Sequence, residues 1–354
     1  MGVFKPLLPV GGEPAALRCA RIAREAGVSD VIFVTGHNAE ELRSALQSYD
    51  PDAIIAHNEF YRDGMYSSVQ TGARALAELQ KAAERPVSLE GFFILPADCC
   101  AFTADNLRAL IRRLREDKGE HVIRPAHKER RGHPPLIPIV CLRLLLTYVG
   151  EDGLRGFLAP LPSIEIEMGP GVLSDMDTPE DYALLLENLG LPGYPDRAAC
   201  RVLLAKHATP PDIVEHGEQV AALALEIARS MQAKPGARAL DLPLLESACL
   251  LHDIMRAKPD HAREGMKLML REGYPKAAMI IGSHMDMEFE PEAGVGEREL
   301  LYLADKLCRA GQIVTIEERE RELAETYPQG SEALRAAMAR MAVARAVQEA
   351  ISAD

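Results

Sequence analysis

The stretch ACLLHDIMRAKPDHAREG (residues 248–265) decides the fold of the second half of this chain. An apolar helical run ends in the pair His252-Asp253, and His261 follows after a short loop. Residues three, four or seven apart share a helix face, so His252 lies on the same apolar stripe as Leu245. A carboxylate on such a face needs a partner, because burying it unpaired costs several kcal/mol or raises its pKa.

The same anomaly recurs on three other helical segments, where His216, His284 and Asp305 each fall on a largely apolar stripe. A single buried histidine is more often a satisfied core residue than a ligand. A divalent cation, however, explains histidines and carboxylates that converge from separate helices, since it neutralises the carboxylates and accepts the imidazole lone pairs. The pattern therefore predicts a metal centre.

The second half reads as all-α. Its main helices are predicted over residues 211–232, 242–256, 275–286 and 297–314, each with Pro, Asp or Glu near its start. The tail from Glu317 adds an amphipathic helix over 331–351, which we expect to pack on its own domain, although such a stripe also suits a homodimer. The Gly- and Pro-rich segment 189–200 marks a domain boundary near residue 195.

The first half alternates strands and helices. Strands are predicted over 30–36, 52–58 and 91–98, and helices over 15–27, 39–49 and 67–82. This alternation indicates an α/β domain with a mostly parallel sheet covered on both faces, in which ligands gather at the carboxyl ends of the strands. Asp98, directly after the third strand, is then a candidate ligand for Mg²⁺ beside phosphates, although alone it would also suit a turn.

Length, composition and charge limit the classes of function that this protein could have. A chain of 354 residues favours two domains, and a net charge of -13 argues against broad binding of nucleic-acid backbones. No apolar run is long enough to span a membrane and no targeting signal is visible, so we expect a cytoplasmic protein. Seven cysteines without a C-x-x-C pair indicate reduced thiols. A small-molecule substrate fits best.

The order His216, His252-Asp253, Asp305 resembles the H…HD…D signature of the HD-domain metal-dependent phosphohydrolases, over about residues 200 to 315. The resemblance implies that these four residues hold one metal and that Asp253 bridges to a second. His261 and His284 fall where bimetallic members have extra histidines. It thus implies an HD domain over 200–354, with one or two ions of Mn, Fe, Ni, Co or Zn.

The resemblance also implies catalysis at Asp253, with a phosphate ester as substrate. Arg256 or Lys258 would stabilise the charge that develops on the phosphate, although either cation would also suit a plain solvated surface. The common H-D-I-G form reads HDIM here, with Met255 in the glycine position.

The first half resembles the nucleotidyltransferases that act on molybdenum cofactor, in the GT-A-like superfamily, over residues 1–192. Its opening MGVFKPLLPVGG starts inside the family pattern, so we expect a Rossmann-like domain that lacks the first strand and the Gly-rich loop. The resemblance implies that Mg²⁺ is held by Asp98 with Asp175 or Asp177, though DTPEDY is also a good helix start. It implies nucleotide or acceptor contacts for Lys5, Asn58, Gly64, Ser67, Ser68, Gly132 and His133.

The sequence therefore predicts a bifunctional protein, a nucleotidyltransferase-like domain fused to an HD phosphohydrolase acting on a nucleotide-type or cofactor phosphate ester. Two alternatives remain open. A nucleotide sensor would use a degenerate transferase domain to regulate the HD domain, and a structural metalloprotein would use its ion only to tie helices together.

Overall fold

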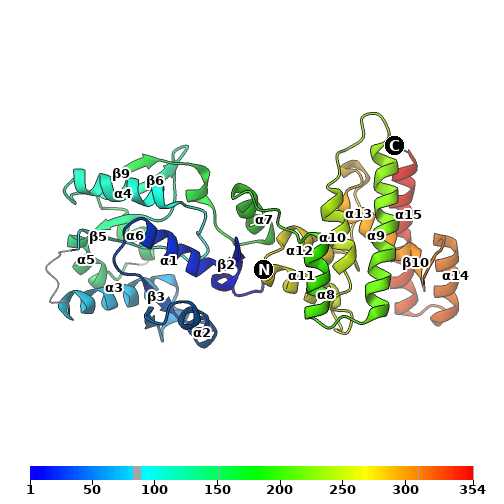
Figure 1. Cartoon of the computed structure of the whole chain (residues 1–354), viewed down its shortest axis with the longest axis horizontal. Coiled ribbons are helices and arrows are strands. Elements are labelled where there is room, and N and C mark those ends of the chain that lie inside the picture. Colours follow the sequence, from blue (N-terminus) through cyan, green and yellow to red (C-terminus); the bar gives the residue numbers. More distant parts are fainter. Residues whose placement is uncertain (83–88, 151, 310, 354) are drawn as a thin grey trace. The chain divides into compact units, whose positions relative to one another are not determined.

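The computed structural model describes residues 1–82, 89–150, 152–309 and 311–353. Its contacts divide the chain into two compact units, Phe4–Gly190 and Leu191–Asp354, the second joined by Met1–Val3. The first is an α/β unit and the second is helical (Figure 1). The predicted fold class, an α/β domain followed by a helical one, is confirmed.

The three predicted strands and three predicted helices of the α/β unit are all present, together with elements that were not predicted. Its helices are α1 (Ala15–Glu25), α2 (Ala39–Tyr49), α3 (Met65–Ala82), α4 (Ala104–Glu116), α5 (Leu142–Thr147), α6 (Gly153–Leu158) and α7 (Pro179–Asn188). Its strands are β1 (Pro9–Val10), β2 (Glu13–Pro14), β3 (Ile32–Thr35), β4 (Ile54–His57), β5 (Gly91–Phe93), β6 (Val122–His127), β7 (Arg130–Arg131), β8 (Leu136–Pro138) and β9 (Ser163–Glu167). Short 3₁₀ turns are η1 (Lys5–Leu7), η2 (Tyr61–Asp63), η3 (Ile139–Cys141) and η4 (Pro170–Leu173).

Strand pairing is mixed rather than uniformly parallel. β3 and β4 pair in parallel, as predicted, and β6 and β9 also pair in parallel. β8, however, runs antiparallel between β5 and β6, and β7 forms a hairpin with β6. Lys128 and Glu129 turn that hairpin with positive φ angles of 48° and 65°, the conformation that a tight two-residue hairpin requires. The strand predicted over 91–98 ends at Phe93, shortly before Pro96, which has no N–H for a sheet.

Helices cover both faces of the larger sheet. Neighbouring residues of one strand point to opposite faces and so contact different helices. On one face, Ile137 of β8 joins a buried cluster with Ala73 of α3 and Phe157 of α6. On the other face, Leu136 and α4 close over Gly91, where a Cβ would lie 2.8 Å from Leu114 of α4. Full burial of each such side chain contributes about 1.5–3 kcal/mol.

The helical unit contains a bundle with one short hairpin. Its elements are α8 (Arg197–Lys206), α9 (Pro211–Gln232), α10 (Leu242–Leu251), α11 (His261–Arg271), α12 (Pro275–Gly282), η5 (Pro291–Ala293), α13 (Glu297–Leu307), β10 (Cys308–Arg309), β11 (Gln312–Ile313), α14 (Ile316–Thr326) and α15 (Glu332–Ala353). α9 matches its prediction. α10, α12 and α13 end earlier than the predicted limits of 256, 286 and 314.

Each early end has a local cause. After α10 the backbone continues in separate turns, with bonds from Ile254 N to Leu251 O and from Arg256 N to Asp253 O, rather than in an α-helical ladder. After α13 the chain enters the β10–β11 hairpin, in which Cys308 pairs with Ile313.

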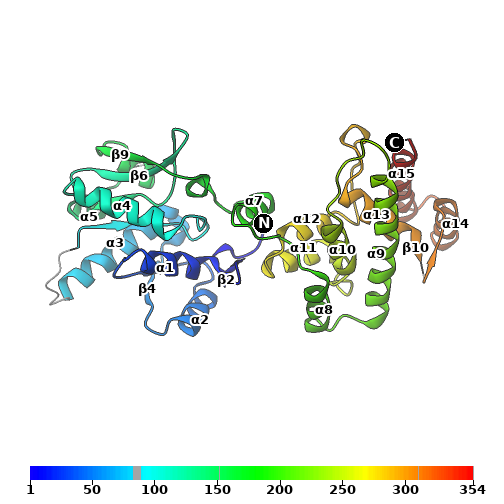
Figure 2. The ribbon, with the colours of Figure 1, turned by 45° about the horizontal axis from the view of Figure 1, so that its top comes forward.

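The C-terminal tail packs on its own unit, as expected. α15 buries Leu334, Met341, Ala344 and Val347, and it contacts α13 and α14. Figure 2 shows α15 beside α13. In addition, the Tyr302 hydroxyl of α13 donates to the Arg340 carbonyl oxygen of α15 at 3.1 Å. Within the described ranges, no helix is long and apolar enough to cross a membrane.

Candidate metal centre

Five segments bring the predicted ligands of the helical unit together. His216 lies on α9 and Asp305 on α13, whereas His252-Asp253 directly follows α10. His261 is the first residue of α11, and His284 lies two residues beyond the end of α12. Gly217 allows α9 to approach α10, since a Cβ there would lie 3.0 Å from the Leu250 carbonyl oxygen. The structure thus gathers every metal ligand predicted for this unit.

The first ligand group joins His216, His252, Asp253 and Asp305. Asp305 Oδ1 lies 3.1 Å from His216 Nε2 and 3.4 Å from His252 Nε2. The Oδ2 atom of Asp253 lies 3.7 Å from His252 Nε2. Ligand atoms of His216, His252 and Asp253 all lie within 4.8 Å of one another, a spacing that a single ion can span.

The second ligand group joins Asp253, His261 and His284. The other carboxylate oxygen, Asp253 Oδ1, lies 3.2 Å from His261 Nε2 and 3.5 Å from His284 Nε2. The two Nε2 atoms are 3.3 Å apart. Asp253 therefore turns one oxygen to each group, which is the geometry of a bridging carboxylate.

Backbone carbonyls fix the tautomers of two histidines. The Nδ1 atom of His252 lies 2.8 Å from the Cys249 carbonyl oxygen, and that of His284 lies 2.7 Å from the Ile281 carbonyl oxygen. A carbonyl oxygen only accepts, so each Nδ1 carries a proton and donates it. The Nε2 lone pairs are left for an ion, an arrangement common around protein-bound metals.

Two buried polar atoms of this centre, His252 Nε2 and Asp253 Oδ1, lack a hydrogen-bond partner among the described residues. His252 is fully buried and Asp253 is 5% exposed. Leaving such atoms unpaired costs about 1–3 kcal/mol each. Because one atom belongs to each ligand group, the residues present fit divalent ions at both places.

The carboxylates stay ionised. Burial acts to raise the pKa of Asp253, but the adjacent His261 and His284 outweigh it and hold this pKa well below its usual range. The pKa of Asp305 is also well below its usual range, because the Lys306 ammonium foremost, with His216 and His252 beside it, outweighs its burial. Burial lowers the pKa of His284, which keeps this imidazole neutral and able to bind a metal.

The two predicted phosphate cations differ in position. Arg256 Nη1 lies 3.2 Å from His261 Nε2 and 3.5 Å from Asp253 Oδ1, while 53% of its side chain is exposed. Its guanidinium thus lies at the solvent-exposed edge of the second ligand group. Lys258 is exposed and forms no hydrogen bond or ion pair with the ligand residues in the part of the chain that the structure describes.

Lys306 belongs to this centre although the sequence did not mark it. It is only 8% exposed, and its Nζ lies 2.7 Å from Asp305 Oδ2. The signal available in the sequence was a lysine inside the apolar run LLYLADKL.

In the α/β unit, a second polar cluster forms around Lys5, whose Nζ lies 3.3 Å from Asp98 Oδ2 and also pairs with Asp177. Burial and the nearby Asp177, Asp181 and Asp98 raise the pKa of Asp175. Burial lowers the pKa of His133, against the attraction of Asp98 and Asp175. These predicted residues therefore lie in one neighbourhood.

The carboxylates of that neighbourhood do not by themselves form a preformed metal cluster. Among the described residues, Asp98, Asp175 and Asp177 are not a set whose ligand atoms all lie within 4.8 Å. Lys5 bridges two of them instead. Thr178 caps α7 by accepting from Asp181 N, so the DTPEDY segment is also the helix start that the sequence suggested.

Three of the predicted nucleotide contacts, Asn58, Ser67 and Ser68, form a hydrogen-bonded cluster. Asn58 is 1% exposed, and its Nδ2 donates to Ser67 Oγ and Ser68 Oγ at 2.8 and 2.9 Å. Its Oδ1 accepts from Phe60 N at 3.0 Å. Gly64, with φ of 99°, turns the chain into α3. The Asn58 side chain thus shapes this loop from within, and its contact with a nucleotide stays a prediction.

Gly132 of the predicted acceptor loop is required for close packing. A Cβ there would lie 2.3 Å from the Val172 carbonyl oxygen. The next residue, His133, donates its backbone N–H to that same oxygen at 2.8 Å.

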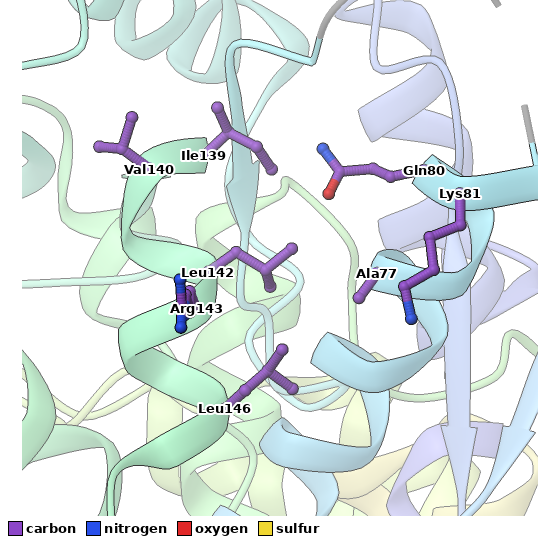
Figure 3. A pocket seen from close by; sticks show the side chains of 8 residues that line it. All are labelled: Ala77, Gln80, Lys81, Ile139, Val140, Leu142, Arg143 and Leu146. Carbon is purple, nitrogen blue, oxygen red and sulfur yellow. The ribbon is translucent and has the colours of Figure 1, made fainter.

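A shallow apolar groove on the α/β unit lies apart from these clusters. It runs between the last turns of α3 and the η3–α5 segment, where Ala77, Ile139, Leu142 and Leu146 face one another (Figure 3). None of the residues lining it is a predicted site residue.

Comparison with known families agrees with this division. Residues 1–165 match the MobA-like NTP transferase domain, and residues 213–310 match the HD domain. A search of the curated proteins found no match.

Solved structures similar to this chain include nucleotidyltransferases. Rv0371c from Mycobacterium tuberculosis H37Rv is 22% identical, with a TM-score of 0.43, over 53% of this chain and 91% of that one. A nucleotidyl transferase from Methanothermobacter thermautotroptrophicus is 22% identical, with a TM-score of 0.43, over 53% and 86%. A 4-diphosphocytidyl-2C-methyl-D-erythritol synthase is 18% identical, with a TM-score of 0.39, over 52% and 92%.

Proposed function

The chain joins a MobA-like NTP transferase domain to an HD domain, and we propose that the HD domain is a metal-dependent phosphohydrolase. Its substrate class would be a phosphomonoester or phosphodiester of a nucleotide-type or cofactor compound. The α/β domain would bind, or transfer, a related nucleotidyl group. Neither domain would bind nucleic acid or membrane.

One observation carries the hydrolase proposal: the two oxygens of Asp253 face two separate ligand groups, each with a buried atom that lacks a partner. Imidazole and carboxylate ligands together suit Mn, Fe, Ni, Co or Zn. Divalent ions bound there would supply a water molecule of lowered pKa and would polarise a phosphoryl oxygen.

The protein's own contribution is to position and to balance charge. His252 and His284 hold their Nε2 atoms toward the two groups through their Nδ1 bonds. Arg256, half-exposed beside Asp253, presents its guanidinium where a substrate phosphate would meet the ligands. A guanidinium suits two phosphate oxygens at once, so it would stabilise the negative charge that grows as the ester bond breaks.

Phosphate release from a panel of nucleotides and phosphate esters, titrated with Mn²⁺, tests the hydrolase. Asp253→Ala should abolish metal-dependent release. Asp212→Ala is the matched control, because this exposed carboxylate lies one turn before His216 on the same helix. Full activity in Asp253→Ala would refute the proposal. A metal that binds tightly while no ester is cleaved would instead support a structural ion.

For the α/β domain we propose that Lys5, Asp98 and Asp177 receive the phosphates of a nucleoside triphosphate together with Mg²⁺. The support is the ion-paired arrangement of one lysine between two carboxylates. On binding, Lys5 would exchange a carboxylate for a phosphate oxygen and free Asp98 and Asp177 for the ion, since oxygen ligands are what Mg²⁺ prefers.

Calorimetric titration with each Mg²⁺–nucleoside triphosphate tests this proposal. We expect Lys5→Met and Asp98→Asn to weaken binding, whereas Lys81→Met, an exposed surface variant, should not. Binding without any turnover to a nucleotidyl product would favour the nucleotide sensor. Undisturbed binding in both variants would exclude this cluster as the site.

A further inference from the structure

We propose that Lys306 is a positioning residue that couples the two ligand groups of the metal centre. It holds one oxygen of Asp305 away from the first group, and it anchors the backbone of His284 for the second. This inference rests on the metal centre proposed above, and it concerns a residue outside the predicted ligand set.

The surroundings of Lys306 form a built site for one ammonium group. The residue is 8% exposed, in the last turn of α13. Its Nζ donates to Asp305 Oδ2 at 2.7 Å and to the His284 carbonyl oxygen at 3.2 Å, and it lies 4.5 Å from the centroid of the Tyr302 ring. Burying an ammonium costs several kcal/mol unless partners compensate, and here a carboxylate, a carbonyl oxygen and an aromatic ring do so.

The first consequence concerns how Asp305 binds an ion. Lys306 occupies Oδ2, whereas Oδ1 faces His216 Nε2 and His252 Nε2 at 3.1 and 3.4 Å. Only one oxygen is therefore turned to the first group. Asp305 would act as a single-oxygen ligand, which keeps the number of protein ligands low and leaves room for water or substrate.

The second consequence concerns His284. α12 ends at Gly282, so the backbone of His284 lies outside a helix. Its ring is oriented by the bond from Nδ1 to Ile281 O, and its carbonyl is held by Lys306. With both restraints in place, Nε2 lies 3.3 Å from His261 Nε2 and 3.5 Å from Asp253 Oδ1. Lys306 thus ties a ligand of one group to the loop that carries a ligand of the other.

Two substitutions separate this role from mere filling of space. Lys306→Met keeps the unbranched stem against Tyr302 but removes the charge and the donors. Lys306→Gln retains a neutral donor for Asp305, so it should restore part of what Met loses. The matched control is Lys206→Met, which removes an ion pair of the same 2.7 Å length, with Glu272, from an exposed position of the same unit.

The measurement is Mn²⁺ titration calorimetry with elemental analysis, on the full chain purified without metal and checked for helix content. Loss of an outer contact of this kind typically weakens metal binding about 10- to 100-fold. We expect Lys306→Met to lose affinity in that range at both groups, Lys306→Gln to lose less, and Lys206→Met to match the wild type. If Lys306→Met does not fold, the test is the comparison of Mn²⁺ affinity between Lys306→Gln and Lys206→Met.

A spectroscopic readout addresses coordination directly. With Co²⁺ in the centre, Lys306→Met should free Asp305 to bind through both oxygens, which raises the coordination number and weakens the visible absorption bands. Wild-type affinity and an unchanged Co²⁺ spectrum in Lys306→Met would overturn the inference. A wild-type protein that binds no metal would instead refute the metal centre itself, so the two failures are distinguishable.

Discussion

The Nε2 atoms of His261 and His284 lie 3.3 Å apart in the interior of the helical unit. Two such nitrogens cannot both carry protons at this distance, and His284 already donates from Nδ1. At least one lone pair therefore points at the other ring. Together with Asp253 Oδ1, the pair is arranged for a positively charged partner.

Arg256 is expected to act on substrate and not on the metal. Its side chain is 53% exposed although it reaches the second group. Arg256→Met should lower kcat/KM for phosphate-ester hydrolysis by about 10²- to 10³-fold, the usual effect of removing one donor to developing charge. Elemental analysis should show an unchanged metal content. Arg263→Met, on an exposed turn of α11, serves as the control; a matching loss there, or loss of metal in Arg256→Met, would contradict this role.

All seven cysteines are free, and only Cys141 is partly exposed. Burial raises the pKa of Cys100 to about 12 and that of Cys200 to about 11, so these thiols react slowly at pH 8. We expect a thiol reagent to modify about one group in the native protein, at Cys141, and all seven after unfolding without reductant. A total below seven in the unfolded protein would show that a disulfide forms.

The packing of α15 should depend on pH. Arg345 donates to Glu317 Oε1 and Glu320 Oε2 of α14 at 2.6 and 2.8 Å, and its hydrogen bond lowers the pKa of Glu317. A lowered folded-state pKa gives stability that is present above the unfolded pKa and is lost as pH falls through the folded value. Glu317→Gln should thus lower Tm slightly at pH 7, and this difference should vanish as the pH falls through the lowered folded-state pKa of Glu317. The control is exposed Glu349→Gln; a Tm difference for Glu317→Gln that persists at low pH would contradict this origin.

Asn58 should matter for stability even without a nucleotide. Its buried amide donates two hydrogen bonds to Ser67 and Ser68 in the first turn of α3 and accepts one from Phe60 in the preceding loop. Asn58→Ala leaves buried partners unpaired, so urea unfolding should show a loss of about 1–3 kcal/mol. Exposed Asn188→Ala should stay near the wild type. If the two variants are equally stable, these hydrogen bonds contribute nothing to the free energy of unfolding, and the Asn58 side chain is free to bind a ligand.

Helical periodicity places His216, His252, His284 and Asp305 on apolar faces, which indicates a metal centre. The bridging role of Asp253 and the place of His261 came instead from the resemblance to the HD-domain family. The geometry of the centre was not predicted. The predicted helices ran through His252 and His284, whereas both residues lie where helices have just ended. The turns that follow α10 are closed by local backbone bonds, from Ile254 N to Leu251 O and from Arg256 N to Asp253 O, and apolar periodicity does not distinguish them from a continuing helix.

The role of Lys306 was likewise not predictable from the sequence pattern. Next to Asp305 on a helix, a lysine usually reads as a solvated charge. Its burial follows from the position of the His284 loop and of Tyr302, which comes from packing between elements distant in sequence. The antiparallel course of β8 was hidden likewise, because alternation and composition identify a strand but not the direction of its neighbour.

The metal content of the purified protein tests the central claim most directly. Elemental analysis of the wild type and of His284→Ala should give about two transition-metal ions per chain in the first and about one in the second, since His284 belongs only to the second group. Two ions retained in His284→Ala, or none in the wild type, would contradict the two-group metal centre.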